Sequence, residues 1–276
     1  MAGTILLDVP MGTELNARGV ETPLPGWSAH ALEDAPGLVR DIHRAYAAAG
    51  ASIHTTNTFR TRPAVFPDWE RLARTAVRLA REGLGPGHRL AGSIAPLQDC
   101  YRPDLSPAGS DHAGTLTAHG ELASLLAAEG CDLLLCETFP HVGEGLLATQ
   151  AAVATGLETW TSFTAGPDAD LLTPREVAAG AIEAVRIGAS AVLVNCVPAR
   201  CTLEYVEALA EAVGDQVTIG AYSNAGQVDE KMGWASAPGA PEAYAECAAT
   251  WVAAGAQLIG GCCGTGPDHV AALAAL

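Results

Sequence analysis

The stretch "LLAAEGCDLLLCET", residues 125–138, contains the repeating unit that decides the fold. Its first part is a helical, Ala/Leu-rich segment that ends at Gly130, and a continuous apolar run follows over residues 132–138. A glycine just past a helix adopts the left-handed conformation that closes the last turn. A short apolar run without alternation is typical of a strand that is buried on both faces of a parallel sheet. The stretch therefore predicts a helix followed by a parallel strand.

The same unit recurs along the chain. The phrases "AYAAAGAS", "AVATGLET", "AVRIGASA" and "WVAAGAQL" repeat the helix ending. Candidate strands cover residues 4–9, 52–58, 89–95, 132–138, 158–164, 191–197, 216–223 and 257–263. Eight strand–helix units predict an α/β fold, a (β/α)8 barrel of the TIM type. A doubly wound open sheet is the alternative, but "DVPMGTEL" stands where its glycine-rich dinucleotide motif would follow the first strand.

Length and composition favour one barrel domain over residues 1–276. Barrels of this size are common, and no linker or change of composition divides the chain. No apolar run approaches the roughly 18 residues of a membrane span, and the N-terminus lacks the basic region of a signal peptide. The eight cysteines are scattered, unlike a secreted disulfide framework. We therefore expect a cytoplasmic protein.

The charge balance limits the partners. The formal net charge is −16, from 31 acidic and 15 basic residues. This acidity opposes binding to nucleic acid and to anionic membranes, which requires a basic surface. We expect small-molecule partners, and the sequence leaves the oligomeric state open.

Two long connections are candidates for the walls of a site. Residues 10–34 and 96–114 are rich in Pro, Gly and polar residues, and each follows a predicted strand. Loops that follow strands lie on the C-terminal face of a barrel, where the active sites of this fold are built. Polar residues and cysteines also stand at the strand ends: Asp8, Thr56, Glu137, Asn195, Cys196, Ser223, Asn224, Cys262 and Cys263.

Three of these residues predict a metal site. Adjacent cysteines such as Cys262 and Cys263 are poorly placed to form a disulfide with each other. In a barrel Cys196 can approach both, and three thiolates favour a soft ion such as Zn²⁺, with one position left open as in catalytic zinc sites. A substrate thiol in that position would be deprotonated and would attack an alkyl donor. The alternative is that cysteines act as small buried apolar residues. We apply it to Cys100, Cys131, Cys136, Cys201 and Cys247.

The chain closely resembles the homocysteine S-methyltransferase family nearly from end to end. The phrases that carry the resemblance are "LLDVPMGTEL", "GSIAP", "GCDLLLCETFP", "VNCV", "YSNAGQ" and "GAQLIGGCCGTGPDHV". The family includes S-methylmethionine-dependent enzymes, betaine–homocysteine methyltransferase and the homocysteine-binding domain of methionine synthase. The resemblance implies a zinc-bearing barrel in which Cys196, Cys262 and Cys263 are the ligands and the substrate thiol is the fourth.

The resemblance also implies roles for residues around the metal. Asp8 and Glu137 would hold the ammonium group of the bound amino acid. Met11, Thr56 and Ser223 would line the pocket, and Asn195 would orient a ligand or the substrate. The structural alternatives are that Asp8 caps the following turn and that Asn195 satisfies backbone groups at the barrel end. We expect His54 and His269 to be structural.

The sequence departs from the family pattern at two places. Val9 and Pro10 stand where the family has paired glycines, and Pro10 has no N–H. If that backbone normally holds the substrate carboxylate, this protein holds it differently or binds another thiol. In "YSNAGQ" the family usually has Pro at Ser223 and Glu at Gln227. The loss of a negative charge at Gln227 could alter the preference for a cationic donor.

The sequence therefore predicts a stand-alone zinc-dependent S-methyltransferase. It would transfer a methyl group from a small sulfonium donor, S-methylmethionine or S-adenosylmethionine, to homocysteine and so produce methionine. One alternative is the same zinc–thiolate chemistry on a different thiol or donor. The other is a non-catalytic binding homologue.

Overall fold

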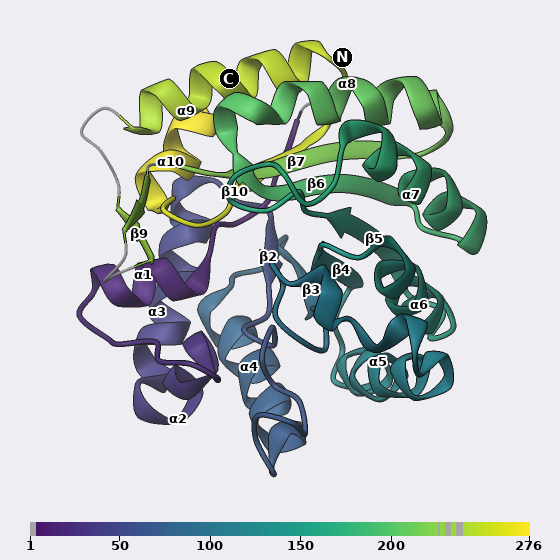
Figure 1. Cartoon of the computed structure of the whole chain (residues 1–276). Coiled ribbons are helices and arrows are strands. Elements are labelled where there is room, and N and C mark those ends of the chain that lie inside the picture. The colour runs from purple at the N-terminus through teal and green to yellow at the C-terminus, as the bar shows by residue number, and fades with distance from the viewer. Residues whose placement is uncertain (1–3, 226, 230–232, 236–239) are drawn as a thin grey trace.

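The computed structural model describes residues 4–225, 227–229, 233–235 and 240–276. Its main sheet contains eight parallel strands in the order β1-β10-β7-β6-β5-β4-β3-β2 (Figure 1). The strands are β1 (Ile5–Leu6), β2 (Ile53–Thr55), β3 (Arg89–Ile94), β4 (Leu133–Phe139), β5 (Glu158–Phe163), β6 (Ala191–Pro198), β7 (Thr218–Asn224) and β10 (Leu258–Gly261). All eight predicted strands are confirmed.

The two ends of this sheet meet. Leu7 forms a parallel bridge with Ile53, and the backbone N–H of Asp8 donates to the carbonyl of Ile53 at 2.8 Å. The N–H of Ser52 donates in turn to the carbonyl of Leu6 at 2.9 Å. The sheet is therefore a nearly closed barrel. The TIM-type fold is confirmed, and the open doubly wound sheet is wrong.

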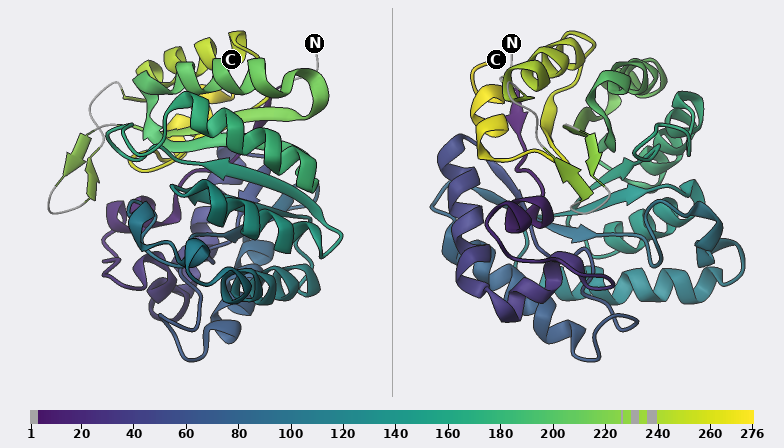
Figure 2. Two further views of the ribbon diagram at one scale, coloured as in Figure 1. Left: turned by 45° about the vertical axis from the view of Figure 1, so that its right-hand side comes forward. Right: turned by 60° about the vertical axis from the view of Figure 1, so that its left-hand side comes forward.

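Helices cover the outside of the barrel, as the right-hand view of Figure 2 shows. They are α3 (Pro36–Ala49), α4 (Trp69–Gly83), α5 (His112–Ala128), α6 (Val142–Val153), α7 (Pro174–Ile187), α8 (Thr202–Val213), α9 (Ala240–Ala253) and α10 (Pro267–Leu273). The first long connection contains the short helices α1 (Met11–Ala17) and α2 (Ala31–Asp34). An antiparallel hairpin of β8 (Gln227–Asp229) and β9 (Gly233–Ala235) follows β7, and the sequence patterns did not predict it.

The glycines at the predicted helix ends have the expected backbone conformation. Their φ angles lie between 83° and 124°, a region that side chains with a Cβ rarely adopt. These residues are Gly50, Gly130, Gly156, Gly188 and Gly255. In each case the glycine ends a helix and lets the chain turn back into the next strand.

Side chains along the strands alternate between two apolar clusters. Leu133 and Leu135 of β4 pack inside the barrel, whereas Leu134 and Cys136 pack outward against the helices. This period of two follows from the pleat of a strand. It determines which side chains at the strand ends can face the interior of the barrel.

Gly220 of β7 allows two strands to pack closely. A Cβ atom at this position would lie 2.6 Å from both Cβ and the carbonyl oxygen of Leu258 on β10. We expect Gly220→Ala to lower the free energy of unfolding by about 1–3 kcal/mol, because the strands must move apart. Urea denaturation measures this. Gly85→Ala, where a Cβ would meet nothing within 4 Å, should change stability by no more than about 0.5 kcal/mol. Equal effects of the two variants would contradict the packing argument.

Candidate active site

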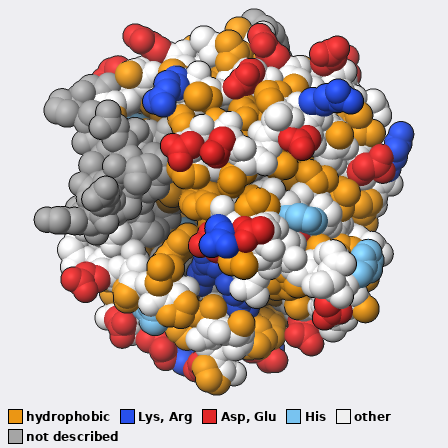
Figure 3. Space-filling model, in the orientation of Figure 1, with side chains coloured by type: hydrophobic (Ala, Val, Ile, Leu, Met, Phe, Trp, Pro, Cys, Tyr) orange, Lys and Arg blue, Asp and Glu red, His pale blue; other side chains and the backbone are white. Residues whose placement is uncertain are grey.

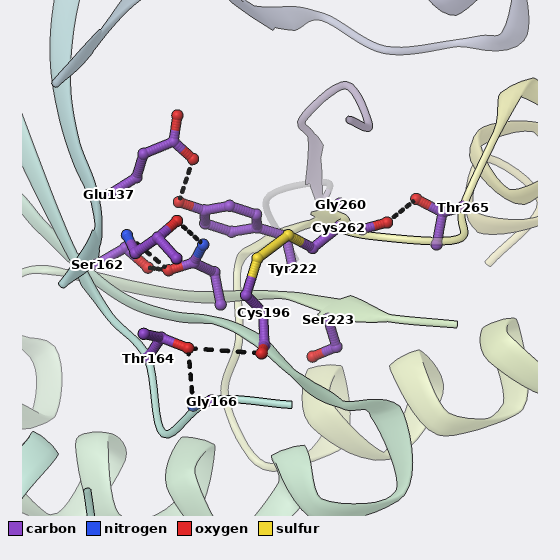
Figure 4. The surroundings of a disulfide bond; sticks show 12 residues. Glu137, Ser162, Thr164, Gly166, Cys196, Tyr222, Ser223, Gly260, Cys262 and Thr265 are labelled. Carbon is purple, nitrogen blue, oxygen red and sulfur yellow. Dashed lines mark hydrogen bonds between the residues drawn. A yellow bond between two sulfur atoms is a disulfide. The ribbon is translucent and has the colours of Figure 1, made fainter. Parts of the chain in front are cut away.

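Three cysteines meet at the C-terminal ends of β6 and β10. The sulfur atoms of Cys196, Cys262 and Cys263 all lie within 4.8 Å of one another. Cys196 and Cys262 are joined by a disulfide with a Cα–Cα distance of 5.5 Å (Figure 4), and Cys263 is free. The sequence analysis expected three free thiols, whereas the structure has two of these cysteines joined in a disulfide. It arises because the two strand ends bring these sulfur atoms within bonding distance.

The backbone at Cys196 directs this side chain into the barrel. The register between β6 and β7 shifts between Asn195 and Pro198, and Cys196 has a φ of 53°. Both Leu193 and Cys196 contact the interior cluster although they are three residues apart, which a regular strand does not allow. Such an irregularity re-aims a side chain, and a positive φ costs about 1–3 kcal/mol that the surroundings must offset.

The side chain of Asn195 forms hydrogen bonds with the C-terminal end of β4. Its Oδ1 accepts hydrogen bonds from the backbone N–H of Thr138 at 3.1 Å and from Oγ of Ser162 at 2.7 Å. Its Nδ2 donates to Oγ1 of Thr138 at 2.7 Å. Thr138 has a φ of 61°, so the fully buried amide supports a strained residue directly after Glu137. These contacts agree with the structural alternative, in which Asn195 satisfies backbone groups at the end of the barrel. Asn195 directly precedes Cys196 in the chain.

Asp8 and Glu137 are the acidic groups of the site. The carboxylate of Asp8 accepts from the N–H and from Oγ1 of Thr55, both at 2.9 Å. Glu137 accepts from Oγ of Ser93 at 2.5 Å and from the hydroxyl of Tyr222 at 3.3 Å. Burial raises the pKa of Asp8 to about 8, with a smaller contribution from the charge of Glu137. Burial likewise raises the pKa of Glu137 to about 7. A cationic ligand would favour the ionised form of both.

The second long connection reaches the cysteines through Tyr101. The side chains of Tyr101 and Cys263 both pack against the interior cluster. Burial raises the pKa of Cys263 to about 11, and the neighbouring Tyr101 opposes this effect. The thiol is therefore protonated at neutral pH unless a cation stabilises the thiolate.

The other residues expected to line the pocket, Met11, Thr56 and Ser223, differ in their surroundings. Met11 is the first residue of α1 and is half-buried against the apolar cluster that packs on α3. The Oγ1 of Thr56 accepts from the N–H of Ser93 at 3.0 Å and pairs with Oγ1 of Thr58 at 2.7 Å. Ser223 faces outward, since its Oγ pairs with Oγ1 of Thr202 on α8 at 2.6 Å.

Sequence reasoning missed three residues that bind the acidic groups. Thr55 bonds to Asp8, and Ser93 and Tyr222 bond to Glu137. Each lies on the inward face of its strand. The signal that could have found them is the period of two, which places Tyr222 inside the barrel and the neighbouring Ser223 outside it.

The departures from the family pattern occupy packed positions. Val9 is buried in the cluster beside α3, and a Cβ at Gly261 would lie 2.7 Å from its Cγ1. The carbonyl of Pro10 accepts from the hydroxyl of Tyr46 at 2.9 Å. Gln227 begins β8, where only the backbone belongs to the described structure, so the charge effect expected at its side chain lies outside the described residues.

The residues expected to be structural, two histidines and five cysteines, do not belong to the cysteine cluster. His54 is fully buried and its Nε2 contacts the carbonyl of Ala51 at 3.1 Å. In α10, which begins at Pro267, Nδ1 of His269 accepts from the N–H of Gly266 at 3.2 Å. Cys100, Cys131 and Cys136 are buried as expected. Cys201 and Cys247 are partly exposed, so full burial is wrong for them: Cys201 precedes α8 and Cys247 lies at the edge of the outer cluster on α9.

The raised pKa values of Asp8 and Glu137 predict the pH dependence of stability. A carboxyl group with a raised pKa binds its proton more tightly in the folded protein, so stability falls as pH rises toward that pKa. The pKa values of His43 and His54 are lowered by burial to about 4 and about 3, and this effect is complete above the ordinary histidine value of 6.5. Between about pH 6.5 and 8 we therefore expect the free energy of unfolding to decrease.

Chemical denaturation of reduced, metal-free protein across this pH range measures the effect. Asp8→Asn should flatten the decrease, because the amide keeps the shape of the side chain and does not titrate. A slope that is unchanged in Asp8→Asn, or a stability that increases over this range, would contradict the raised pKa of Asp8.

A parallel barrel with a cysteine cluster and with one buried and one partly buried carboxyl group at its C-terminal mouth defines a class of TIM-barrel enzymes that act on small molecules. The family model for homocysteine S-methyltransferase matches residues 5–276. The chain belongs to this family and is a methyltransferase. No helix in the described part of the chain has the length and apolar character to cross a membrane.

Individual relatives cover almost the whole chain. Homocysteine S-methyltransferase from Escherichia coli (strain K12) is 32% identical over 98% of this chain and 94% of its own length. The crystal structure of the homocysteine methyltransferase MmuM from Escherichia coli, metallated form, has a TM-score of 0.80 at 27% identity, covering 99% of this chain and 96% of that chain. The oxidized form of the same protein also has a TM-score of 0.80, at 29% identity, covering 99% and 95%.

Proposed function

We propose that the protein is a zinc-dependent homocysteine S-methyltransferase that uses a small sulfonium donor and produces methionine. The observation that carries the proposal is the convergence of three sulfur atoms within 4.8 Å at the mouth of the barrel. One barrel domain over residues 1–276 would perform the reaction. The proposal places the protein in the cytoplasm, where reducing conditions keep the three thiols available.

The chain's own residues fit a zinc ion. After reduction of the disulfide, Cys196, Cys262 and Cys263 offer three sulfur donors from two strand ends, a set that favours Zn²⁺ over Mg²⁺ or Ca²⁺. A zinc ion bound by these residues would lower the pKa of a substrate thiol and supply a thiolate nucleophile at neutral pH. The Escherichia coli relative MmuM has been solved in a metallated form, which supports the same interpretation for this chain.

Asp8 and Glu137 would bind the ammonium group of the amino-acid acceptor. Both carboxyl groups lie at the barrel mouth, and both have raised pKa values because burial leaves their negative charge uncompensated. An ammonium group between them would compensate that charge. The hydrogen bonds from Thr55, Ser93 and Tyr222 orient the two carboxylates for this contact.

The test is a mass-spectrometric transfer assay on reduced, zinc-loaded protein. Homocysteine would be supplied with methyl-deuterated S-methylmethionine or S-adenosylmethionine in parallel reactions. Labelled methionine supports the proposal, and the faster donor identifies the subclass. The absence of labelled methionine with both donors, in protein shown to contain zinc, would overturn homocysteine as the acceptor.

A different thiol acceptor is the second candidate. The observation that favours it is the packed Val9–Pro10 segment, in which Pro10 has no N–H and its carbonyl is bound by Tyr46. This segment therefore offers a substrate carboxylate fewer backbone N–H donors than the paired glycines of the family would. A competition assay with a panel of thiols separates the candidates, because a preferred thiol other than homocysteine would take most of the label.

A further inference from the structure

Arg60 is a buried arginine in the loop that follows β2. Its side chain is 5% exposed, and its Cζ lies 4.3 Å from the centroid of the Trp27 ring and 5.3 Å from that of Phe59. The Nη1 group donates to the carbonyl of Gln98 at 3.0 Å, and Nε has no partner. The guanidinium is therefore held in place by aromatic rings and one carbonyl, and its charge is not neutralised by these contacts.

The charge of Arg60 lacks a carboxylate partner among the described residues. Elsewhere in the described chain, arginines either lie within 4.0 Å of a carboxylate or are exposed to solvent, apart from Arg62. A buried cation without an anion is unfavourable. None of the described carboxylates pairs with this buried arginine, so a carboxylate of a bound substrate is a candidate partner for it. Figure 3 shows basic side chains set into a recess of the surface.

The contacts of Arg60 place it in the wall of the candidate site. Trp27 belongs to the first long connection and Gln98 to the second. Three residues after Gln98, Tyr101 packs against the same interior cluster as Cys263. Arg60 therefore lies where both long connections meet, at the C-terminal end of the barrel that also carries the cysteine cluster.

Arg62 faces elsewhere, although it is also partly buried. It donates to the carbonyl of Pro96 and lines a cavity of about 30 Å³ together with Trp69 and His119. The charge of Glu144 acts on Arg62. Arg60 does not line this cavity. The two arginines therefore differ in their surroundings: Arg62 lines this cavity, whereas Arg60 stacks on Trp27 of the first long connection.

An amino-acid substrate also carries a carboxylate, which needs hydrogen-bond donors of its own. With its ammonium group at Asp8 and Glu137, its carboxylate must still find a donor, and Pro10 has no N–H to offer. A guanidinium presents a planar set of N–H donors that matches a carboxylate. We propose that Arg60 binds the α-carboxylate of an amino-acid substrate, the acceptor or the sulfonium donor. The proposal rests on the proposed function and identifies a specificity residue for it.

The test compares substrates with and without the carboxylate in Arg60→Met. The acceptor pair is homocysteine and 3-aminopropanethiol. The donor pair is S-methylmethionine and (3-aminopropyl)dimethylsulfonium. We expect kcat/KM to fall about 10- to 100-fold for one carboxylate-bearing substrate, because a charged hydrogen-bonded pair is lost, with little change for its decarboxylated counterpart. The affected pair shows whether acceptor or donor binds Arg60.

Two further variants separate recognition from support of the loops. Arg60→Lys keeps the charge and should recover part of the loss. Arg102→Met, in the same long connection as Gln98 but exposed and paired with Asp104, should behave like the wild type. Equal losses with and without the carboxylate, or no loss at all, would overturn the proposal.

Calorimetry keeps this test independent of catalysis. Binding of homocysteine and of 3-aminopropanethiol to the reduced protein, and of the two donors in the same way, is measured without turnover. If the wild type transfers no methyl group, the proposed function fails. Selective loss of carboxylate binding in Arg60→Met would still support the inference, and unchanged binding would overturn it.

Discussion

Replacement of Cys263 by Ser is expected to abolish zinc binding and to reduce methyl transfer by about 100-fold or more. Loss of a hydrogen-bond partner of a metal ligand already costs about 10- to 100-fold, and loss of the ligand itself should cost at least as much. Cys263 is the cluster member that is outside the disulfide, and the neighbouring Tyr101 is unchanged in the variant. Metal content by plasma mass spectrometry and the labelled-methyl assay measure the two losses.

Cys247→Ser is the matched control for this variant. Cys247 is a partly exposed cysteine on α9 and does not belong to the cluster. We expect this variant to bind one zinc ion and to keep wild-type activity. A Cys263→Ser protein that is free of zinc and still transfers methyl groups at the wild-type rate would contradict the zinc mechanism.

The largest effect on stability is expected at Trp251. This side chain on α9 is fully buried, and its ring packs edge-to-face against Tyr244 with a centroid distance of 5.5 Å. The hydroxyl of Tyr244 donates to the carbonyl of Gly260 at 2.7 Å and accepts from the N–H of Ser223 at 2.9 Å. Tyr244 therefore connects β7 to β10 at a point two residues before Cys262, and Trp251 supports Tyr244.

We expect Trp251→Ala to lower the free energy of unfolding by about 3–5 kcal/mol, because it leaves a large cavity between α9 and the barrel. Denaturation in urea measures the loss. Leu105→Ala, at a side chain that is 45% exposed, should cost no more than about 0.5 kcal/mol. A loss below about 1 kcal/mol in Trp251→Ala would show that the site collapses around the smaller residue.

Local patterns were sufficient for the fold. The apolar runs gave the eight strands, and the glycines from Gly50 to Gly255 marked the helix ends, because both signals depend on neighbouring residues alone. The barrel then follows from the number of units. The hairpin of β8 and β9 was missed, since "QVD" and "GWA" are too short for a pattern of two to be recognised.

The candidate site could be predicted only in part. Strand ends that converge in a barrel placed Asp8, Glu137 and the three cysteines together from the sequence. The sequence analysis expected Ser223 to line the pocket, but Ser223 faces outward and pairs with Thr202. Its neighbour Tyr222 faces inward, and its hydroxyl bonds to Glu137. The pleat determines which of the two residues faces inward, and it could have been applied before the structure was known.

By itself the sequence determined the eight strands of the barrel, their order and the end of the barrel that carries the chemistry, because these depend on local periodicity and on strand direction. Only the tertiary structure decided that Cys196 turns inward through a positive φ, that Tyr101 packs on the same cluster as Cys263, and that Arg60 contacts Trp27 and Gln98. The contacts of Tyr101 and Arg60 join segments far apart in the chain. The physical reason is that such contacts depend on how loops close over the finished barrel, which no local pattern encodes.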